Sequence, residues 1–292
     1  MRLATNEGYF RKKYGSDQKR SYEEAASICK SCGFHVIDVG LTDQTPEQNF
    51  ALRAQYQEDA QRYKEYCDGL GIQINQTHAR YDFFRISREQ FISDLIKSVE
   101  ITKIFGADNM VVHADTYYDP EYRFQYDEVL NIIYEIYAPV VEHAKKCNVK
   151  IAMETLFEDR APAGKRARFT SYVSELDDIV SKFNDPIVGI CWDFGHARVA
   201  HGDNQFEEME KVGKKIISTH VHDNHWNLDM HSLPFMGNTD WHKGMKTLKE
   251  IGYKGDLTFE MVYGCVPDAL LTDYAAWCRK IGEYLINDFV NA

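Results

Sequence analysis

Short apolar runs rich in β-branched residues alternate with longer amphipathic segments along the whole chain. The short runs predict eight strands, at residues 2–5, 34–40, 71–77, 109–114, 149–154, 187–193, 216–222 and 256–261. The longer segments predict helices near residues 21–32, 47–69, 89–105, 125–147, 171–183, 204–214, 241–251 and 268–287. Eight strands, each followed by a helix, are typical of a (β/α)8 TIM barrel, an α/β fold.

Residues typical of helix ends support these boundaries. Ser21 and Ser171 are predicted N-caps, and Glu24 completes a capping box with Ser21. Glycines follow four of the helical runs, where a left-handed residue is favoured, at positions 33, 71, 106 and 252. No glycine-rich turn follows the first strand, so the runner-up architecture, a doubly wound open sheet, is disfavoured.

Length and hydropathy fit one barrel better than several small units. The chain has 292 residues, of which 44% are hydrophobic, and a mean hydropathy of −0.48. A TIM barrel typically needs about 250 residues, and no linker-like stretch divides the sequence. We therefore expect a single domain over residues 1–292. The sequence contains neither a membrane span nor an apolar secretory region, so a cytoplasmic protein without a membrane partner is expected.

The charge and the cysteines exclude some alternatives. A net charge of −11 disfavours a nucleic-acid partner, because phosphate neutralisation needs a basic surface. Seven cysteines, an odd number, do not suggest a disulfide framework. Cys29 and Cys32 form one C-x2-C late in a predicted helix, with no second pair to complete a zinc site. We interpret them as core or surface thiols.

Histidine, aspartate and glutamate recur at the C-terminal ends of six consecutive predicted strands, the third to the eighth. They are His78, His113, Glu154, Asp193, His220 and Glu260. Successive members are 35, 41, 39, 27 and 40 residues apart, about one strand–helix unit each. The C-terminal strand ends of a barrel meet at one mouth, where barrel enzymes build their active sites. We therefore expect these side chains to converge.

A cation is the simplest way to keep such a cluster stable. Buried carboxylates packed together repel one another and lose hydration unless a positive charge lies between them. Mixed imidazole and carboxylate ligands suit Zn²⁺, Mn²⁺ or Co²⁺ better than Ca²⁺, and Mg²⁺ prefers oxygen ligands. Zn²⁺ or Mn²⁺ is the favoured cofactor.

Several segments carry a family resemblance. They are VVHAD (111–115), IAMETLFED (151–159), GICWDFGHARVAHGD (189–203), STHVHDN (218–224) and GNTDWHKGMKTLKEIGYKGDLTFEM (237–261). In order and spacing they resemble the xylose-isomerase-like barrel superfamily, which contains sugar and sugar-phosphate isomerases and epimerases as well as endonuclease IV.

The resemblance to the sugar enzymes implies one metal held by a Glu, an Asp, a His and a second Glu on strands five to eight. These roles fall on Glu154, Asp193, His220 and Glu260. His222 competes with His220, because residues two apart on a strand face the same side. The family pattern His-x-x-Asp, matched by His220 and Asp223, favours His220.

The endonuclease branch binds three zinc ions with nine ligands, and this chain has a residue at every position. Five residues would join the four above in a multi-metal centre: His78, His113, His196, Asp229 and His231. The spacings Asp193-x-x-His196 and Asp229-x-His231 reproduce that branch, so one to three ions are expected. Two segments instead resemble the sequences of the sugar enzymes, namely WDFGHARVAHGD and HVHDNHW.

Substrate contacts are predicted in two loops. Lys165, Arg166 and Arg168 follow the fifth strand and could bind a phosphate or carboxylate. His225 and Trp226 follow the seventh strand and could pack on a sugar. Free-ketose 3-epimerases have an arginine where this chain has Trp226, which argues against that substrate class.

These features predict a metal-dependent sugar or sugar-phosphate isomerase or epimerase. The metal would stabilise an enediolate, and Glu154 and Glu260 would exchange the proton. His196 would donate to a substrate hydroxyl or bind a further metal. A multi-zinc phosphodiester hydrolase and a non-catalytic sugar-binding protein are the alternatives. The expected partner is a small carbohydrate, and assembly into a homo-oligomer stays open.

Overall fold

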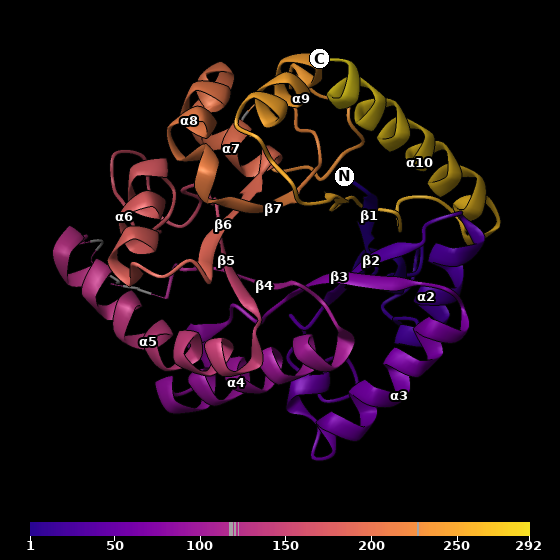
Figure 1. Cartoon of the computed structure of the whole chain (residues 1–292), viewed down its shortest axis with the longest axis horizontal. Helices are drawn as coiled ribbons and strands as arrows, with labels where there is room; N and C mark the ends of the chain where they lie inside the picture. The colour runs from indigo at the N-terminus through magenta and orange to yellow at the C-terminus, as the bar shows by residue number, and fades with distance from the viewer. Residues whose placement is uncertain (117–118, 120, 122, 227) are drawn as a thin grey trace.

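Eight parallel strands form a ring at the centre of the computed structural model, which describes residues 1–292 except 117, 118, 120, 122 and 227 (Figure 1). The strands are β1 (Leu3–Asn6), β2 (Val36–Gly40), β3 (Gln73–His78), β4 (Asn109–Val112), β5 (Lys150–Glu154), β6 (Val188–Asp193), β7 (Ile216–His220) and β8 (Leu257–Phe259). Neighbours along the chain are neighbours in the sheet, and β1 also pairs with β8.

A short parallel bridge between β7 and β8 closes the ring. The backbone N–H of Val221 donates to the carbonyl of Thr258 at 2.8 Å, and the N–H of Glu260 donates to the carbonyl of Val221 at 3.1 Å. The predicted (β/α)8 barrel is therefore confirmed, and the open-sheet alternative is wrong.

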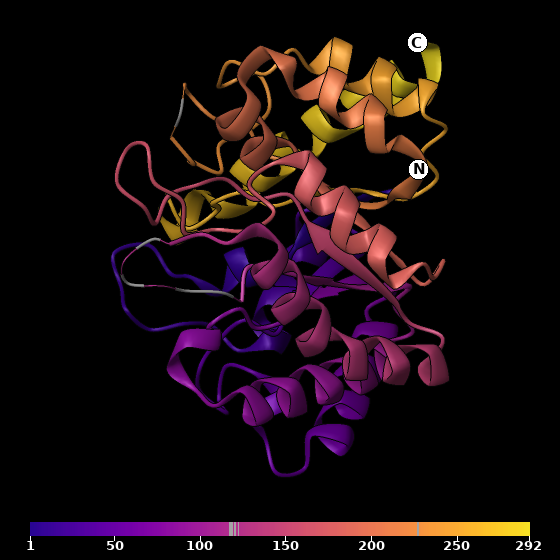
Figure 2. The ribbon, with the colours of Figure 1, turned by 90° about the vertical axis from the view of Figure 1, so that its left-hand side faces the viewer.

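Helices accompany the strands, and the longer ones surround the ring on its outside (Figures 1 and 2). They are α1 (Gly8–Arg11), α2 (Tyr22–Ser31), α3 (Tyr56–Gly69), α4 (Arg88–Phe105), α5 (Tyr126–Cys147), α6 (Val173–Phe183), α7 (Phe194–His201), α8 (Gln205–Val212), α9 (Trp241–Glu250) and α10 (Asp268–Asn291). None of the helices in the described part of the chain has the length and apolarity needed to cross a membrane.

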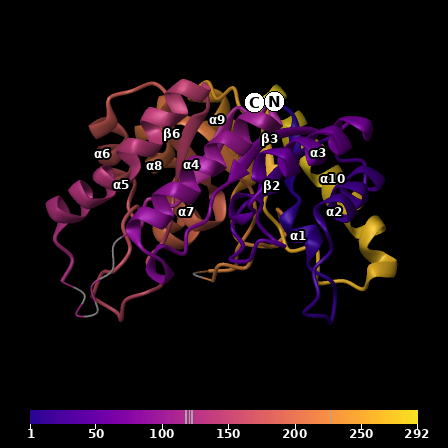
Figure 3. The same ribbon diagram turned by 90° about the horizontal axis from the view of Figure 1, so that it is seen from below.

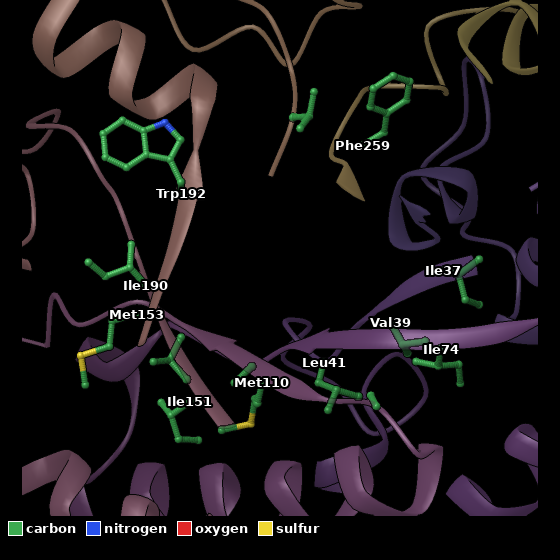
Figure 4. Close-up of a cluster of buried hydrophobic side chains, with 14 of the residues drawn as sticks. Ile37, Val39, Leu41, Ile74, Met110, Ile151, Met153, Ile190, Trp192 and Phe259 are labelled. Carbon is green, nitrogen blue, oxygen red and sulfur yellow. The ribbon is translucent and has the colours of Figure 1, made fainter. Parts of the chain in front are cut away.

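The main core lies between the strands and the helices. Ile37, Val39, Ile190 and Trp192 point outward from the strands and are buried (Figure 4). Residues between them, such as Asp38 and Cys191, point inward because side chains alternate along a strand. The inside of the barrel thus receives polar groups, and its C-terminal end can carry chemistry without weakening the outer core.

Long loops gather at one end of the barrel, and both chain termini lie at the other (Figures 2 and 3). These loops follow the C-terminal ends of the strands. All seven cysteines are free thiols, and Cys29 and Cys32 lie buried at the end of α2, as core thiols. Burial raises the pKa of both thiols.

Several details differ from the sequence-based expectation, and three of them have a clear local cause. The predicted helix at 47–69 is divided, because the Asn49 side chain caps a 3-10 turn (Phe50–Leu52) and also donates to the carbonyls of Leu41 and Asp43. Helix α7 was not predicted, since it starts at the last residue of β6 without a polar spacer. The N-cap of α6 is Tyr172, because the hydroxyl of Ser171 donates to the carbonyl of Arg168.

Candidate metal centre

The side chains predicted at the strand ends converge at the mouth of the barrel. His78, Glu154, Asp193 and His220 are the last residues of β3, β5, β6 and β7, while His113 and Glu260 directly follow β4 and β8. They surround the floor of a cavity of about 840 Å³. Its lining includes seven of the predicted ligands, namely His78, His113, Glu154, His196, Asp229, His231 and Glu260. Asp193 and His220 are fully buried.

Glu154 lies at the centre of the cluster and joins two groups of possible ligands. Its Oε2 is 3.0 Å from His78 Nε2 and 2.9 Å from His113 Nε2. Its Oε1 is 3.0 Å from His220 Nδ1, which is also 3.1 Å from Glu260 Oε2. One group is therefore His78, His113 and Glu154, and the other is Glu154, Asp193, His220 and Glu260. Within each group the ligand atoms lie within 4.8 Å of one another.

The inward side chains of β2 and β3 hold the ring of His220 in position. Gln76 Nε2 is 3.0 Å from His220 Nε2, and Asp38 Oδ2 is 3.6 Å from the same nitrogen. The Nδ1 edge of the ring therefore faces the two glutamates. Such outer partners fix the orientation of metal-binding histidines. Sequence analysis missed both residues, although a polar side chain within a buried strand is a usable signal.

Asp193 has two structural tasks besides its place in the cluster. Its Oδ1 accepts the backbone N–H of His196 at 2.7 Å, which caps α7, and lies 3.0 Å from His222 Nε2. Its Oδ2 lies 3.7 Å from His220 Nδ1. The bond that caps α7 therefore fixes the orientation of this carboxylate. The cap forms because α7 begins directly after the end of β6.

A third group lies beside the other two. It consists of His196, His222, Asp229 and His231, whose ligand atoms are also within 4.8 Å of one another. Asp229 Oδ2 lies 3.6 Å from His196 Nε2 and 3.3 Å from His231 Nε2. The two histidines that competed for one role in the sequence therefore belong to different groups. His220 belongs to the group with Glu154, Asp193 and Glu260, and His222 belongs to this third group.

Asp223 anchors the loop that carries Asp229 and His231. Its two carboxylate oxygens accept backbone N–H groups of Asn224, Phe235, Gly237 and Thr239, and the indole N–H of Trp241. The aspartate of the His-x-x-Asp pattern is therefore a loop anchor in this structure, next to the ligand groups.

Opposite charges dominate the electrostatics of the cluster. Burial would raise the pKa of Glu154 and of Glu260, but the adjacent histidines, His220 first, lower both. Burial would lower the pKa of His231, but its bond to Asp229 raises that pKa to about 9. The buried carboxylates thus favour positive charge on several of the rings, since the pKa values of His78, His196, His220 and His231 are raised, whereas burial lowers the pKa of His113. A divalent cation would supply the same compensation, so the donor set fits a metal.

Metal binding at pH 7 should therefore release protons, because a histidine must be neutral to bind a metal. The carboxylates around His196 and His231 raise the pKa of both above the ordinary value, that of His231 to about 9, so the His231 ring is positively charged at pH 7 in the metal-free protein. The apparent affinity should rise with pH up to about 9, the pKa of His231. Calorimetric titration with Zn²⁺ in two buffers of different ionisation enthalpy measures the release. Equal heats in both buffers would contradict it.

The predicted substrate contacts are placed unequally. Arg168 lines the cavity and is 2.9 Å from both Asp115 and Asp159. Arg166 instead pairs with Glu175. Lys165, in the same loop, is exposed. In the loop after β7, His225 is exposed and Trp226 is 77% exposed. Of the five, all within the described chain, only Arg168 belongs to the cavity lining.

Two tyrosines of the cavity were missed by sequence analysis. The Tyr9 hydroxyl is 3.1 Å from His231 Nδ1, and the Tyr81 ring stacks on His113 with centroids 4.6 Å apart. Aromatic rings of this kind can pack against the apolar face of a sugar. Tyr81 lies three residues beyond His78, but nothing in the sequence distinguishes it from other loop tyrosines.

The fold and the donor groups define a (β/α)8 barrel with a candidate metal centre at its C-terminal mouth. The chain belongs to the xylose isomerase-like TIM barrel family, whose model matches residues 26–281. The resemblance inferred from the motifs is thereby confirmed.

Curated relatives match part of the chain. The uncharacterized protein y4fM of Sinorhizobium fredii is 29% identical over 177 residues, which are 59% of this chain and 53% of y4fM. The match thus spans about half the length of the curated relatives.

Solved structures share the fold over nearly the whole chain. A D-tagatose 3-epimerase-like protein has a TM-score of 0.77 at 19% identity, covering 99% of this chain and 100% of that one. The IOLI protein with a bound zinc atom has a TM-score of 0.73 at 18% identity, covering 99% and 98%. At such identities the similarity shows the fold.

Proposed function

We propose that this protein is a divalent-metal-dependent isomerase or epimerase of a sugar or sugar phosphate. The observation that carries the proposal is that Glu154 and Glu260, which line a cavity large enough for a sugar, both contact the buried His220. Fold neighbours that include a D-tagatose 3-epimerase-like protein and a zinc-binding protein support it.

Glu154, Asp193, His220 and Glu260 would hold the principal metal, with Zn²⁺ or Mn²⁺ favoured over Co²⁺ and Mg²⁺. A bound ion of this kind polarises a substrate carbonyl and its neighbouring hydroxyl. The carboxylate of Asp193 is fully buried and absent from the cavity lining, so its role is coordination.

Glu154 and Glu260 are the proposed proton carriers. Both line the cavity, and their carboxylates flank His220 Nδ1 at 3.0 and 3.1 Å. The low pKa of each keeps it ionised at neutral pH, ready to accept a proton from the carbon beside the carbonyl. The protonated carboxyl can then deliver that proton to the neighbouring carbon, which isomerises the sugar, whereas an epimerisation needs the other glutamate to protonate the opposite face of the same carbon.

His196 is the proposed third participant, as a substrate-hydroxyl donor or a further ligand. Its Nδ1 is 3.0 Å from the carbonyl of Thr155, which leaves Nε2 to face Asp229. This orientation favours the ligand role when more than one metal is bound. Arg168 is the proposed substrate contact from the loop after β5, while Lys165, Arg166, His225 and Trp226 stay predictions.

A multi-zinc phosphodiester hydrolase is the second candidate, because all nine ligand positions fall into the three adjacent groups. The charges around the cavity disfavour it. Six carboxylate residues and four lysine or arginine residues line the cavity, and Arg11, Lys19 and Arg168 pair with acidic residues. Such a mouth offers a nucleic-acid backbone little unpaired positive charge. The cytoplasmic location and the oligomeric state stay predictions.

Proton exchange in D₂O tests the proposed reaction. Metal-loaded protein would be incubated with a panel of ketoses and ketose phosphates, and deuterium beside the carbonyl measured by NMR. Exchange into at least one sugar is expected. Binding without exchange would identify a sugar-binding protein. Cleavage of an abasic-site duplex at physiological salt, with no exchange on any sugar, would identify the hydrolase.

A further inference from the structure

His222 is a fully buried histidine that the single-metal scheme leaves without a task. It lies two residues beyond His220 and faces the same side of the strand. The two rings nevertheless serve different groups. His220 contacts Glu154 and Glu260, whereas His222 lies between Asp193 and Asp229.

The two nitrogens of His222 have different surroundings. Nε2 lies 3.0 and 3.2 Å from the two oxygens of Asp193, so it carries a proton and donates to this carboxylate. Nδ1 then has a free lone pair, and it is buried without a hydrogen-bond partner among the described residues. An unsatisfied buried polar atom costs about 1–3 kcal/mol. A metal ion would bind this lone pair, and a carboxylate behind a metal-binding histidine is a common arrangement.

The surrounding donors have separations that suit one small ion. Ligand atoms bound at about 2.0–2.1 Å to a tetrahedral zinc ion lie roughly 3.3 Å from one another. Asp229 lies 3.9 Å from His222 Nδ1, 3.3 Å from His231 Nε2 and 3.6 Å from His196 Nε2. The His222 and His231 rings stack with centroids 3.9 Å apart. Small movements would bring all four donors to bonding distance.

Gly195 makes room for the ring of His222. A Cβ atom at this position would lie 1.9 Å from His222 Cε1, closer than any side chain allows. The side chain of Asn224 also donates to the carbonyl of Gly195 at 2.9 Å, which holds the start of α7 against the segment after β7. The backbone at Gly195, next to His196, therefore leaves space for the His222 ring and fixes its position.

We infer that His222 Nδ1 is the fourth protein ligand of a metal ion that His196, Asp229 and His231 also bind. Three imidazoles and one carboxylate favour Zn²⁺. The ion would fasten the loop segment 228–236 to α7 and to the end of β7. This inference does not depend on which reaction the neighbouring groups catalyse.

Metal content and affinity of His222→Gln test the inference, with His242→Gln as the matched control. Glutamine can still donate to Asp193 but lacks the imidazole nitrogen. His242 lies on the outer helix α9 and bonds Asp288. We expect one zinc site of His222→Gln to weaken by more than about 100-fold, beyond the effect of losing an outer partner. The control should keep the wild-type zinc content. Equal zinc content and affinity in both variants would overturn the inference.

Two measurements on the unaltered protein keep the inference testable if His222→Gln fails to fold. Titration with Co²⁺ should produce the intense visible absorption of a four-coordinate ion, and weak absorption throughout the titration would overturn the inference. Chymotrypsin should cut the metal-free protein near the exposed Leu228 and Phe235 and should cut the zinc-loaded protein more slowly. Cleavage at the same rate in both forms would likewise overturn it. Neither readout requires turnover, so failure here is distinguishable from failure of the proposed sugar chemistry.

Discussion

Replacing Glu260 by glutamine should slow proton exchange about 10²–10⁴-fold at saturating metal, the usual worth of general acid–base assistance. The amide oxygen can still bind a metal, but the amide cannot accept a proton. Glu260 lines the cavity and contacts His220 at 3.1 Å, so the shape of the site should persist. Deuterium exchange and elemental analysis on the same sample separate loss of the base from loss of the metal.

Asp193→Asn is the matched control for this experiment. Asp193 is absent from the cavity lining, and its Oδ1 already accepts from His196 and lies beside His222. The same acid-to-amide change should therefore weaken metal binding, and excess metal should restore most of the activity. If excess metal also restores Glu260→Gln, the proton carrier is another residue, and His196 is the first to test.

Glu154→Gln does not separate loss of the base from loss of the metal, although the sequence suggests that it would. The sequence places Glu154 and Glu260 in equivalent roles. Whereas Glu260 contacts His220, Glu154 contacts His78 and His113 as well as His220 in the structure. Its amide should therefore lose metal and activity together. Only Glu260 separates the two effects.

The barrel and the strand-end residues could be predicted from the sequence because both follow a periodic pattern. A strand–helix unit recurs along the chain, so residues at equivalent ends, such as Glu154 and Glu260, had to meet at one mouth. The start of α7 breaks that pattern, because Asp193 is both the last strand residue and the helix cap. Helix and strand propensities do not indicate that one aspartate both ends a strand and caps the next helix.

The loops were less predictable than the strand ends. Lys165 and Arg168 are three residues apart in one basic stretch, yet only Arg168 turns into the cavity, where it pairs with Asp115 and Asp159. Asp115 is 53 residues away along the chain. Long-range ion pairs of this kind decide which side chain of a loop is buried, and spacing alone does not contain them.

Replacing Asp223 by asparagine should lower the free energy of unfolding by about 2–5 kcal/mol, because each buried donor left without an acceptor costs about 1–3 kcal/mol. The buried carboxylate accepts from four backbone N–H groups and from Trp241. An amide nitrogen in place of either oxygen would face at least two of these donors. The loop with Asp229 and His231 should therefore loosen before the rest of the barrel.

Asp240→Asn makes the same chemical change 17 residues further along the chain. Asp240 is an exposed N-cap of α9 and accepts one backbone N–H, from Lys243 at 3.0 Å. Asparagine caps a helix about as well as aspartate, so the stability should stay nearly unchanged. Urea denaturation of the metal-free variants compares them, and hydrogen exchange locates the change. Equal stability of the two variants would mean that the loop holds its metal-binding residues without Asp223.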